Sequence, residues 1–426
     1  MVRKTALLAA IFAALVAFYL AGLTLVCMIP NGRITGNVSK SFIELSQKYT
    51  RTRMAWTVRS SYFRFNDQMM LNMAARHDKN ALRAAMFPTY FRYWHGYVLF
   101  LRPLLCFFSL PGLWLLAVLL LTPLLLVCLR TVRRRLGADC AAMLAVTFIA
   151  TYVWVIPFAL SYIPVCVVTL AELILACRLR KECLPYMFFI GASLVNFTDF
   201  LTFPLVSLGL PLTEALTAQM KQPGYSMKSG LASVFGNSAA WGAGYALTWM
   251  AKWAAAWYVL GGQVFANITS QAVFRSIGNA AHPTSHILAM TNNLTVLFTV
   301  PLSAAAAFAA AALVIMKLRG VPLRQHIGNF WLLVKKAKDM TVPLSLVAVS
   351  PFIWYLTFAN HSQFHARFTF RELAVSIFAC LTAADTSISG ASPDDRFCRA
   401  VLKRWRECGK IEKYILVILL FIISSI

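Results

Sequence analysis

The chain has 426 residues, of which 59% are hydrophobic and only 13% are charged, and its mean hydropathy is +0.67. This composition excludes an ordinary soluble domain, in which roughly a quarter of the residues carry charge, and the recurring long apolar runs predict a polytopic all-α membrane protein. The net charge of +25 comes from basic residues in loops beside the apolar runs. Such residues set orientation and contact anionic lipid headgroups, so nucleic-acid binding is not expected.

The first apolar stretch runs from Ala6 to Pro30 and exceeds the roughly 7–15 residues of a signal-peptide core. It therefore predicts an uncleaved transmembrane helix, with Arg3 and Lys4 on the cytoplasmic side. Residues from about 31 to 94 are polar, aromatic and rich in arginine. They predict a long external loop with two amphipathic helices on the membrane surface. Because this loop is itself basic, the opposite orientation stays open, and it would reverse every later assignment.

The rest of the chain predicts further crossings, for a total of about eleven transmembrane helices. The stretch Leu184–Leu212 is too long for one helix and predicts two short helices that meet near Asp199. The remaining predicted elements are spans over about Pro111–Leu129, from Ala141, from Ile163 and around Trp241–Trp253, an external loop over about 259–291, a span ending at Met316–Gly320, a basic cytoplasmic stretch Arg324–Lys338, a span Val342–Phe358, an external segment His361–Glu372 and a short returning helix. We expect one transmembrane domain over 1–385, followed by a basic cytoplasmic segment and a terminal hydrophobic helix over 386–426.

Asp67 is a rare acid within the arginine-rich first loop, where it follows Arg64 in RFNDQMMLN. A carboxylate in this position could deprotonate a sugar hydroxyl as a general base, if it reaches the hydroxyl and has a suitable pKa. The alternative is an ion pair with Arg64 or Arg59 on a surface helix.

Asp199 stands in NFTDFLTFP, within an otherwise apolar stretch. An ionisable group at membrane depth is a candidate functional residue, because its burial is costly. It could bind a metal, orient a sugar or pair with Lys252. The alternative is a helix-capping aspartate at the outer interface.

The external segment HSQFHARFTFRE contains His361, His365, Arg367 and Arg371. If the segment is helical, each pair has the spacing that places both members on one face. Arginine forks and histidine donors suit phosphate recognition. Two histidines without a nearby carboxylate are weak evidence for a metal site, and anchoring to lipid headgroups is the alternative role.

Aromatic and basic residues also gather beside the membrane at Tyr93, Trp94, His95, Arg102 and Lys252. They could stack on sugar rings and grip a lipid phosphate. The alternative is an aromatic belt that anchors the protein at the interface.

Several stretches together resemble bacterial membrane proteins of capsule and cell-surface polysaccharide systems and, beyond them, glycosyltransferases of the GT-C fold. The features are a first helix followed at once by a long external loop, the acid in FNDQMMLNMA and the stretch YFRYWHGYVLFLRPLL. Further matching stretches are FTDFLTFPLVSLGLPL, WGAGYALTWMAKW and HSQFHARFTFRELAVS.

The resemblance implies an enzyme of the bacterial cytoplasmic membrane whose active site faces outside. It would transfer a sugar from a polyprenyl-phosphate donor to a glycan or lipid acceptor. Asp67 would be the base and Asp199 a secondary acid. The phosphate contacts would be Arg102, Lys252, His361, His365 and Arg371. Side-chain chemistry alone adds further candidate substrate-binding residues: Arg64, Tyr93, Trp94, His95 and Arg367.

The first loop lacks an adjacent DD, DE or DxD pair, which the resemblance would lead us to expect of a metal-dependent member. A divalent metal is therefore possible but not favoured, and no metal ligand is assigned. Two other functions stay open: a transporter or flippase of lipid-linked saccharides, which would not need Asp67, and a polysaccharide polymerase or ligase.

Overall fold

The computed structural model describes residues 2–51, 61–262, 264–298 and 338–389. Within these ranges the fold is helical, and the strands form one antiparallel hairpin of β1 (Gly278–Asn279) and β2 (His282–Pro283). The predicted all-α class is confirmed. The expected elements at Met316–Gly320 and Arg324–Lys338, and the expected tail beyond Ser389, lie outside the described residues.

The first helix, α1 (Val2–Cys27), covers the predicted first span. The loop that follows it carries helices where amphipathic ones were expected. Its elements are η1 (Asn31–Arg33), α2 (Thr35–Arg51), α3 (Ser61–Ala74), α4 (Ala81–Ala85) and the short helix α5 (Val98–Leu104).

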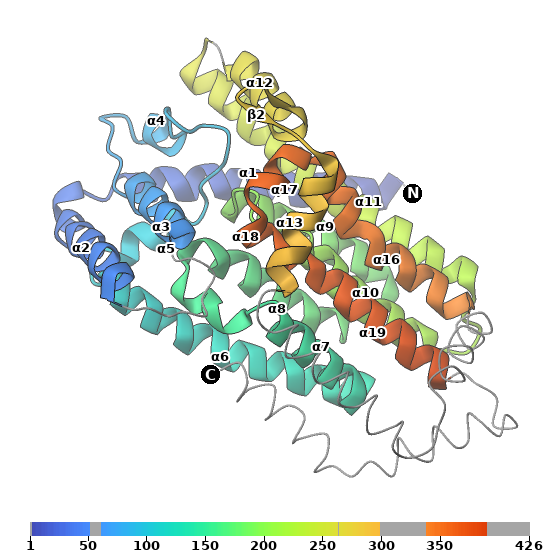
Figure 1. Cartoon of the computed structure of the whole chain (residues 1–426). Coiled ribbons are helices and arrows are strands. Elements are labelled where there is room, and N and C mark those ends of the chain that lie inside the picture. Colours follow the sequence, from blue (N-terminus) through green and yellow to red (C-terminus); the bar gives the residue numbers. More distant parts are fainter. Residues whose placement is uncertain (1, 52–60, 263, 299–337, 390–426) are drawn as a thin grey trace, which may run out of the picture.

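A bundle of longer helices forms the body of the molecule (Figure 1). Its members are α6 (Leu110–Leu136), α7 (Ala138–Ala150), α8 (Ile163–Ala176), α9 (Leu184–Thr198), α10 (Val206–Met220), α11 (Met227–Leu260), α16 (Lys338–Thr357) and α19 (Leu373–Ser389). Local sequence sets their ends. A proline in the first turn starts α6, and Gly137, with φ of +106°, ends it. Ser226 and Ser229 form a capping box at the start of α11.

The predicted break near Asp199 is present, because α9 ends at Thr198 and α10 begins at Val206. Asp199 holds the turn between them. Its Oδ2 accepts a hydrogen bond from the Thr202 backbone N–H at 2.8 Å, and its Oδ1 accepts one from the Thr202 hydroxyl at 2.6 Å. Two short helices thus replace one long helix at this position.

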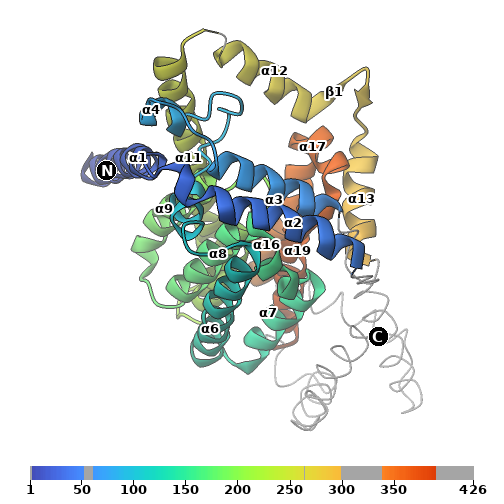
Figure 2. The same cartoon turned by 90° about the vertical axis from the view of Figure 1, so that its left-hand side faces the viewer.

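The remaining short elements gather at one end of the bundle together with α3 and α4 (Figures 1 and 2). We call this the outer end. Its further elements are η2 (Val153–Phe158), η3 (Leu160–Tyr162), α12 (Val264–Ile277), the β1–β2 hairpin, α13 (His286–Phe298), α17 (Ala359–Phe364), α18 (Ala366–Thr369) and η5 (Phe370–Glu372).

The opposite end contains the connection between α6 and α7 and the short η4 (Lys181–Cys183). Basic side chains contact backbone and hydroxyl groups there: Lys221 donates to the Leu136 carbonyl, and Arg178 donates to Thr131 at 3.4 Å. The predicted basic connections between spans therefore lie together, away from the first loop.

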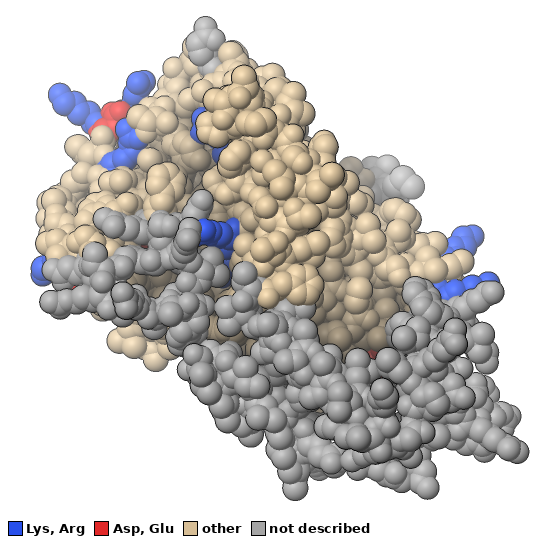
Figure 3. Space-filling model, viewed as in Figure 1, with Lys and Arg blue, Asp and Glu red and all other residues tan. Residues whose placement is uncertain are grey.

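Among the described residues, three helices are long and apolar enough to cross a membrane: Thr5–Cys27, Leu110–Leu136 and Lys338–Thr357. In Figure 3 a wide tan surface without Lys, Arg, Asp or Glu lies between the charged side chains at the upper left and centre and those at the right edge. The other bundle helices are shorter or more polar. The total of about eleven crossings therefore stays a prediction.

Candidate functional site

Asp67 is fully buried on α3, where that helix packs against η3. Neither carboxylate oxygen has a well-aligned hydrogen-bond partner, although the backbone amides of Leu160 and Ser161 approach the group. Burial raises the pKa of the Asp67 carboxyl well above its usual value, and the two amides offset part of this effect. The side chains of Arg59 and Arg64, the alternative ion-pair partners, lie outside the described residues. The carboxyl itself is buried and has unused hydrogen-bonding capacity.

Arg371 lies at the same outer end and is only 2% exposed. Its guanidinium carbon is 4.4 Å from the ring centre of Tyr162, the residue that ends η3. Nη1 donates to the Arg367 carbonyl at 3.2 Å, whereas Nε and Nη2 have no well-aligned hydrogen-bond partner, although the Tyr162 hydroxyl approaches the guanidinium. The Tyr162 hydroxyl is close enough to interact electrostatically with Arg371, Asp67 and Asp199. Tyr162 therefore links the acid of the first loop to the arginine of the last external segment.

The three groups come from α3, η3 and η5, which are far apart in the sequence. Within the described residues, the one ion pair joins Arg83 to Asp78 on the surface. Among the residues that the structure describes, no buried acid forms an ion pair with a buried cation, a costly arrangement that is concentrated at functional sites. An anionic substrate with a hydroxyl group could satisfy both Arg371 and Asp67.

Asp199 has a different environment from Asp67, because Thr202 satisfies both of its oxygens. Burial raises the cost of its charge, and the turn supplies the compensating donors. Asp199 thus stabilises the turn after α9 and does not cap the start of α10, whose N-cap residue is Leu205. The neighbouring carboxylate of Glu372 accepts from the Leu205 backbone N–H at 3.2 Å, where α10 starts. Both acids hold the turn between α9 and α10.

His361 and His365 form part of a second cluster, with ring centres 4.7 Å apart. His361 Nε2 is 2.8 Å from the Leu201 carbonyl, so this nitrogen carries the proton and Nδ1 accepts from Arg275 at 2.9 Å. Burial, together with the charge of Arg275, lowers the pKa of His365 to about 4, which makes its ring neutral near pH 7. Arg275, on α12, was absent from the predicted site.

The remaining predicted side chains mainly contact the protein itself. Arg102 donates to the carbonyls of Ala74, Arg76 and Ile29 and to Asn31 Oδ1, all within 2.8 Å. It therefore ties the end of α3 to the segment after α1.

Lys252 is buried, with Nζ 3.2 Å from the Met86 carbonyl and 5.4 Å from the ring centre of Trp94. Trp94 itself donates to the Thr248 carbonyl at 2.8 Å. His95 contacts the Tyr97 hydroxyl at 2.9 Å and the Tyr90 carbonyl at 2.8 Å. These contacts fix the segment after α4 onto α11, and they lie apart from the Asp67–Arg371 group.

Three other candidate substrate-binding residues are Arg64, Tyr93 and Arg367. The side chain of Arg64 lies outside the described residues. The Tyr93 hydroxyl is buried without a hydrogen-bond partner, and its ring stacks on Trp249 at 6.0 Å. Arg367 is half-buried, and its carbonyl accepts from Arg371.

The described part of the chain contains no group of three or more His, Cys, Asp or Glu side chains that could hold a metal ion. The acids nearest the candidate site face backbone donors rather than one another. The expectation that a divalent metal is possible but not favoured stays a prediction, and no metal ligands are assigned.

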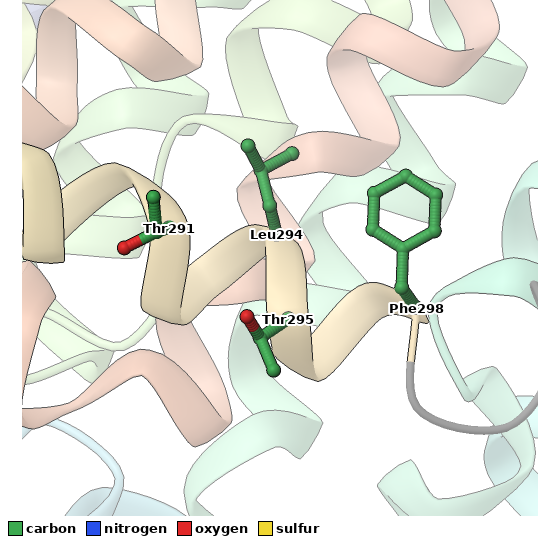
Figure 4. Close-up of a pocket in the computed structure, with 4 residues that line it drawn as sticks. All are labelled: Thr291, Leu294, Thr295 and Phe298. Atoms are coloured by element: carbon green, nitrogen blue, oxygen red, sulfur yellow. The ribbon is translucent and has the colours of Figure 1, made fainter.

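A small cavity of about 30 Å³ lies beside Arg371, with Thr151, Cys166 and Thr169 in its lining. This volume suits a water molecule and is too small for a sugar. A larger hollow of about 360 Å³ lies along α13 between Thr291, Leu294, Thr295 and Phe298 (Figure 4). Its lining has no charged or titratable group, so the hollow is not the candidate site. A sugar phosphate would have to displace side chains around Arg371 to bind.

Comparisons with protein-family models, with curated proteins and with solved structures found no match to this chain. The family resemblance of its sequence stretches therefore remains a proposal.

Tyr162 and Arg275 were missed by sequence reasoning. Tyr162 follows a short apolar segment and reads as an interfacial aromatic, while Arg275 is a single cation in a helix with no other charged residue. An isolated cation within such a helix is a usable signal, because an unpaired charge near the membrane is costly and calls for a partner.

Proposed function

We propose that the chain is a multi-pass glycosyltransferase of the bacterial cytoplasmic membrane, with its outer end facing outside. It would transfer a sugar from a polyprenyl-phosphate donor to a glycan or lipid acceptor. The observation that supports this most strongly is the burial of Asp67, Tyr162 and Arg371 together at the outer end, with unused hydrogen-bonding capacity on the acid and on the arginine.

Each member of this group has a role in the proposed reaction. Arg371 holds the phosphate of the donor and stabilises the negative charge that develops on it as the sugar leaves. Asp67 accepts the proton of the acceptor hydroxyl, whose oxygen forms a bond to the anomeric carbon while the bond to the phosphate oxygen breaks. Tyr162 positions the guanidinium through contact with its ring.

The burial of Arg371 strengthens its interaction with phosphate. In a site that excludes water, an arginine whose Nε and Nη2 have no well-aligned partner can form a bidentate pair with phosphate oxygens. The donor also supplies the counter-charge that the described residues do not provide. A lipid phosphate could reach this site laterally from the membrane, since the site lies at the end of the apolar bundle.

The test compares Asp67→Asn with Asp78→Asn in a strain that lacks its own copy of the gene. Cell-surface glycan is measured, and native mass spectrometry of the extracted protein detects a co-purified polyprenyl phosphate or its glycoside. We expect Asp67→Asn to abolish transfer while the lipid still co-purifies. Asp78→Asn, at a half-buried position of the same loop, should behave as wild type. Full transfer by Asp67→Asn would refute the assigned base, and a co-purified lipid-linked oligosaccharide would instead favour a flippase or polymerase.

A further inference from the structure

Arg92, in the segment that connects α4 to α5, and Arg275, on α12, form a second group of cations without an ion pair among the described residues. Arg92 lies over the ring of Tyr90, with 4.6 Å between its guanidinium carbon and the ring centre. Arg275 lies 5.5 Å from the ring centre of Tyr93 in the same way. The two tyrosine rings are 5.5 Å apart, so an aromatic pair joins the two arginines.

The positions of both arginines are fixed by neighbouring helices. The backbone carbonyl of Arg92 accepts hydrogen bonds from the indole N–H groups of Trp249 at 2.9 Å and Trp253 at 3.2 Å. Its Nη1 donates to Asn267 Oδ1 at 3.1 Å. Asn267 and Arg275 lie eight residues apart on α12, about two turns, and therefore share one face of that helix.

Donors around this pair remain unused. The buried Arg92 Nε, Tyr93 hydroxyl and His365 Nδ1 have no hydrogen-bond partner. Neither arginine forms an ion pair among the described residues, and Asp199, whose charge reaches Tyr93, is satisfied by Thr202. Both arginines are half-buried, so a ligand can reach them without unfolding the helices.

We propose that Arg92 and Arg275, together with Tyr93 and His365, form a second anion site that binds a phosphate group. This site is separate from Arg371, since the turn over 199–205 lies between them: Leu201 contacts His361 in the second cluster, whereas Phe203 contacts Tyr162 and Arg371. In the proposed reaction, on which this part of the inference rests, the second phosphate belongs to the acceptor. The acceptor is then itself a phosphate-linked saccharide.

The binding experiment does not depend on catalysis. The protein is placed in nanodiscs of zwitterionic phospholipid, and native mass spectrometry counts bound farnesyl phosphate, with inorganic pyrophosphate as a soluble competitor. Wild type should bind two farnesyl phosphates. Arg92→Gln/Arg275→Gln and Arg371→Gln should each retain one, with at least about tenfold weaker binding at the altered site. Arg83→Gln, an exposed arginine of the same loop, is the control.

Asn267→Asp provides a second test that does not remove either arginine. An aspartate keeps an acceptor for Arg92 Nη1, so the fold is retained, but it neutralises the cation. We expect weaker binding of phosphate at this site with no loss of thermal stability. Unchanged stoichiometry in Arg92→Gln/Arg275→Gln, or unchanged affinity in Asn267→Asp, would overturn the proposal.

The outcomes of these experiments also distinguish a soluble phosphate from a lipid phosphate, and the second anion site from the proposed transfer reaction. Competition by pyrophosphate supports a site open to soluble phosphates, whereas binding of farnesyl phosphate alone supports a site for lipid phosphate. If Asp67→Asn retains transfer but the two binding events persist, the proposed chemistry fails and the second anion site stands. If only the Arg371 site binds, the second site fails and the proposed function stands.

Discussion

Replacement of Asp67 by asparagine should stabilise the protein, and the gain should grow with pH. Both carboxylate oxygens are buried without a well-aligned hydrogen-bond partner, and burial raises the pKa of the folded-state carboxyl well above its usual value. In the unfolded chain the same carboxyl titrates near pH 4. Above that pH, folding therefore requires the uptake of a proton at Asp67. This requirement lowers the stability of the wild-type protein relative to a variant that cannot titrate.

The magnitude follows from proton linkage. Stability contributed by a group with a raised folded-state pKa is complete below the unfolded pKa and is lost as the pH rises toward the folded one. The loss is about 1.4 kcal/mol per pH unit while the folded state stays protonated and the unfolded state is ionised. Between pH 5 and pH 7 the stability difference between Asp67→Asn and wild type should then widen, by at most about 3 kcal/mol.

The assay is equilibrium unfolding in mixed micelles at several pH values, followed by tryptophan fluorescence. Asp78→Asn is the matched control, because Asp78 is only half-buried and pairs with the exposed Arg83 at 3.3 Å. Loss of such a surface pair costs less than about 1 kcal/mol and should not favour the variant as the pH rises. A stability difference for Asp67→Asn that is constant with pH would refute the reasoning, since it would mean that the amides of Leu160 and Ser161 stabilise an ionised carboxylate.

Three further predictions follow from other contacts. Gly244→Ala should destabilise the protein by about 1–3 kcal/mol, because the new methyl group would collide with the α9 backbone. Gly242→Ala is the control, since a methyl group there meets open space. Equal unfolding midpoints for the two variants would contradict the tight crossing of α9 and α11. Arg102→Lys should lower stability by at least about 2 kcal/mol, because lysine cannot keep the hydrogen bonds of both guanidinium Nη atoms to backbone carbonyls. Arg83→Lys is the control and should change stability little. Weaker phosphate binding by Arg102→Lys at unchanged stability would instead favour the predicted phosphate role. Transfer activity should rise with pH along an acid limb well above pH 4, because Asp67 must lose its proton to act as a base; a limb near pH 4 would exclude it from that role.

Much of the fold follows from local sequence. The apolar run after Lys4, the proline in the first turn of α6 and the break between Thr198 and Val206 all depend on neighbouring residues, so periodicity and helix-stop signals predicted them. The external position of the first loop was predicted from charge and remains untested, although the basic connections do lie at the opposite end of the bundle.

Assignment of the site required tertiary structure. Sequence chemistry marked Asp67 and Arg371 as unusual, but it could not distinguish them from Arg102 and Lys252, which are equally unusual in sequence. The terminal nitrogens of Arg102 and Lys252 bind backbone carbonyls in the fold, although Arg102 Nε has no partner. Both oxygens of Asp67, and Nε and Nη2 of Arg371, lack a well-aligned hydrogen-bond partner.

The sequence by itself determined an all-helical fold with helices long and apolar enough to cross a membrane, and a short set of costly charges, because composition and periodicity act over neighbouring residues. Only the tertiary structure decided which of these charged groups the protein satisfies and which keep unused hydrogen-bonding capacity. Arg92 and Arg275 are 183 residues apart, and no local pattern predicts that they share the Tyr90–Tyr93 pair. Hydrogen bonds between distant segments determine the use of each buried charge, and those contacts depend on the packing of α3, α11 and α12.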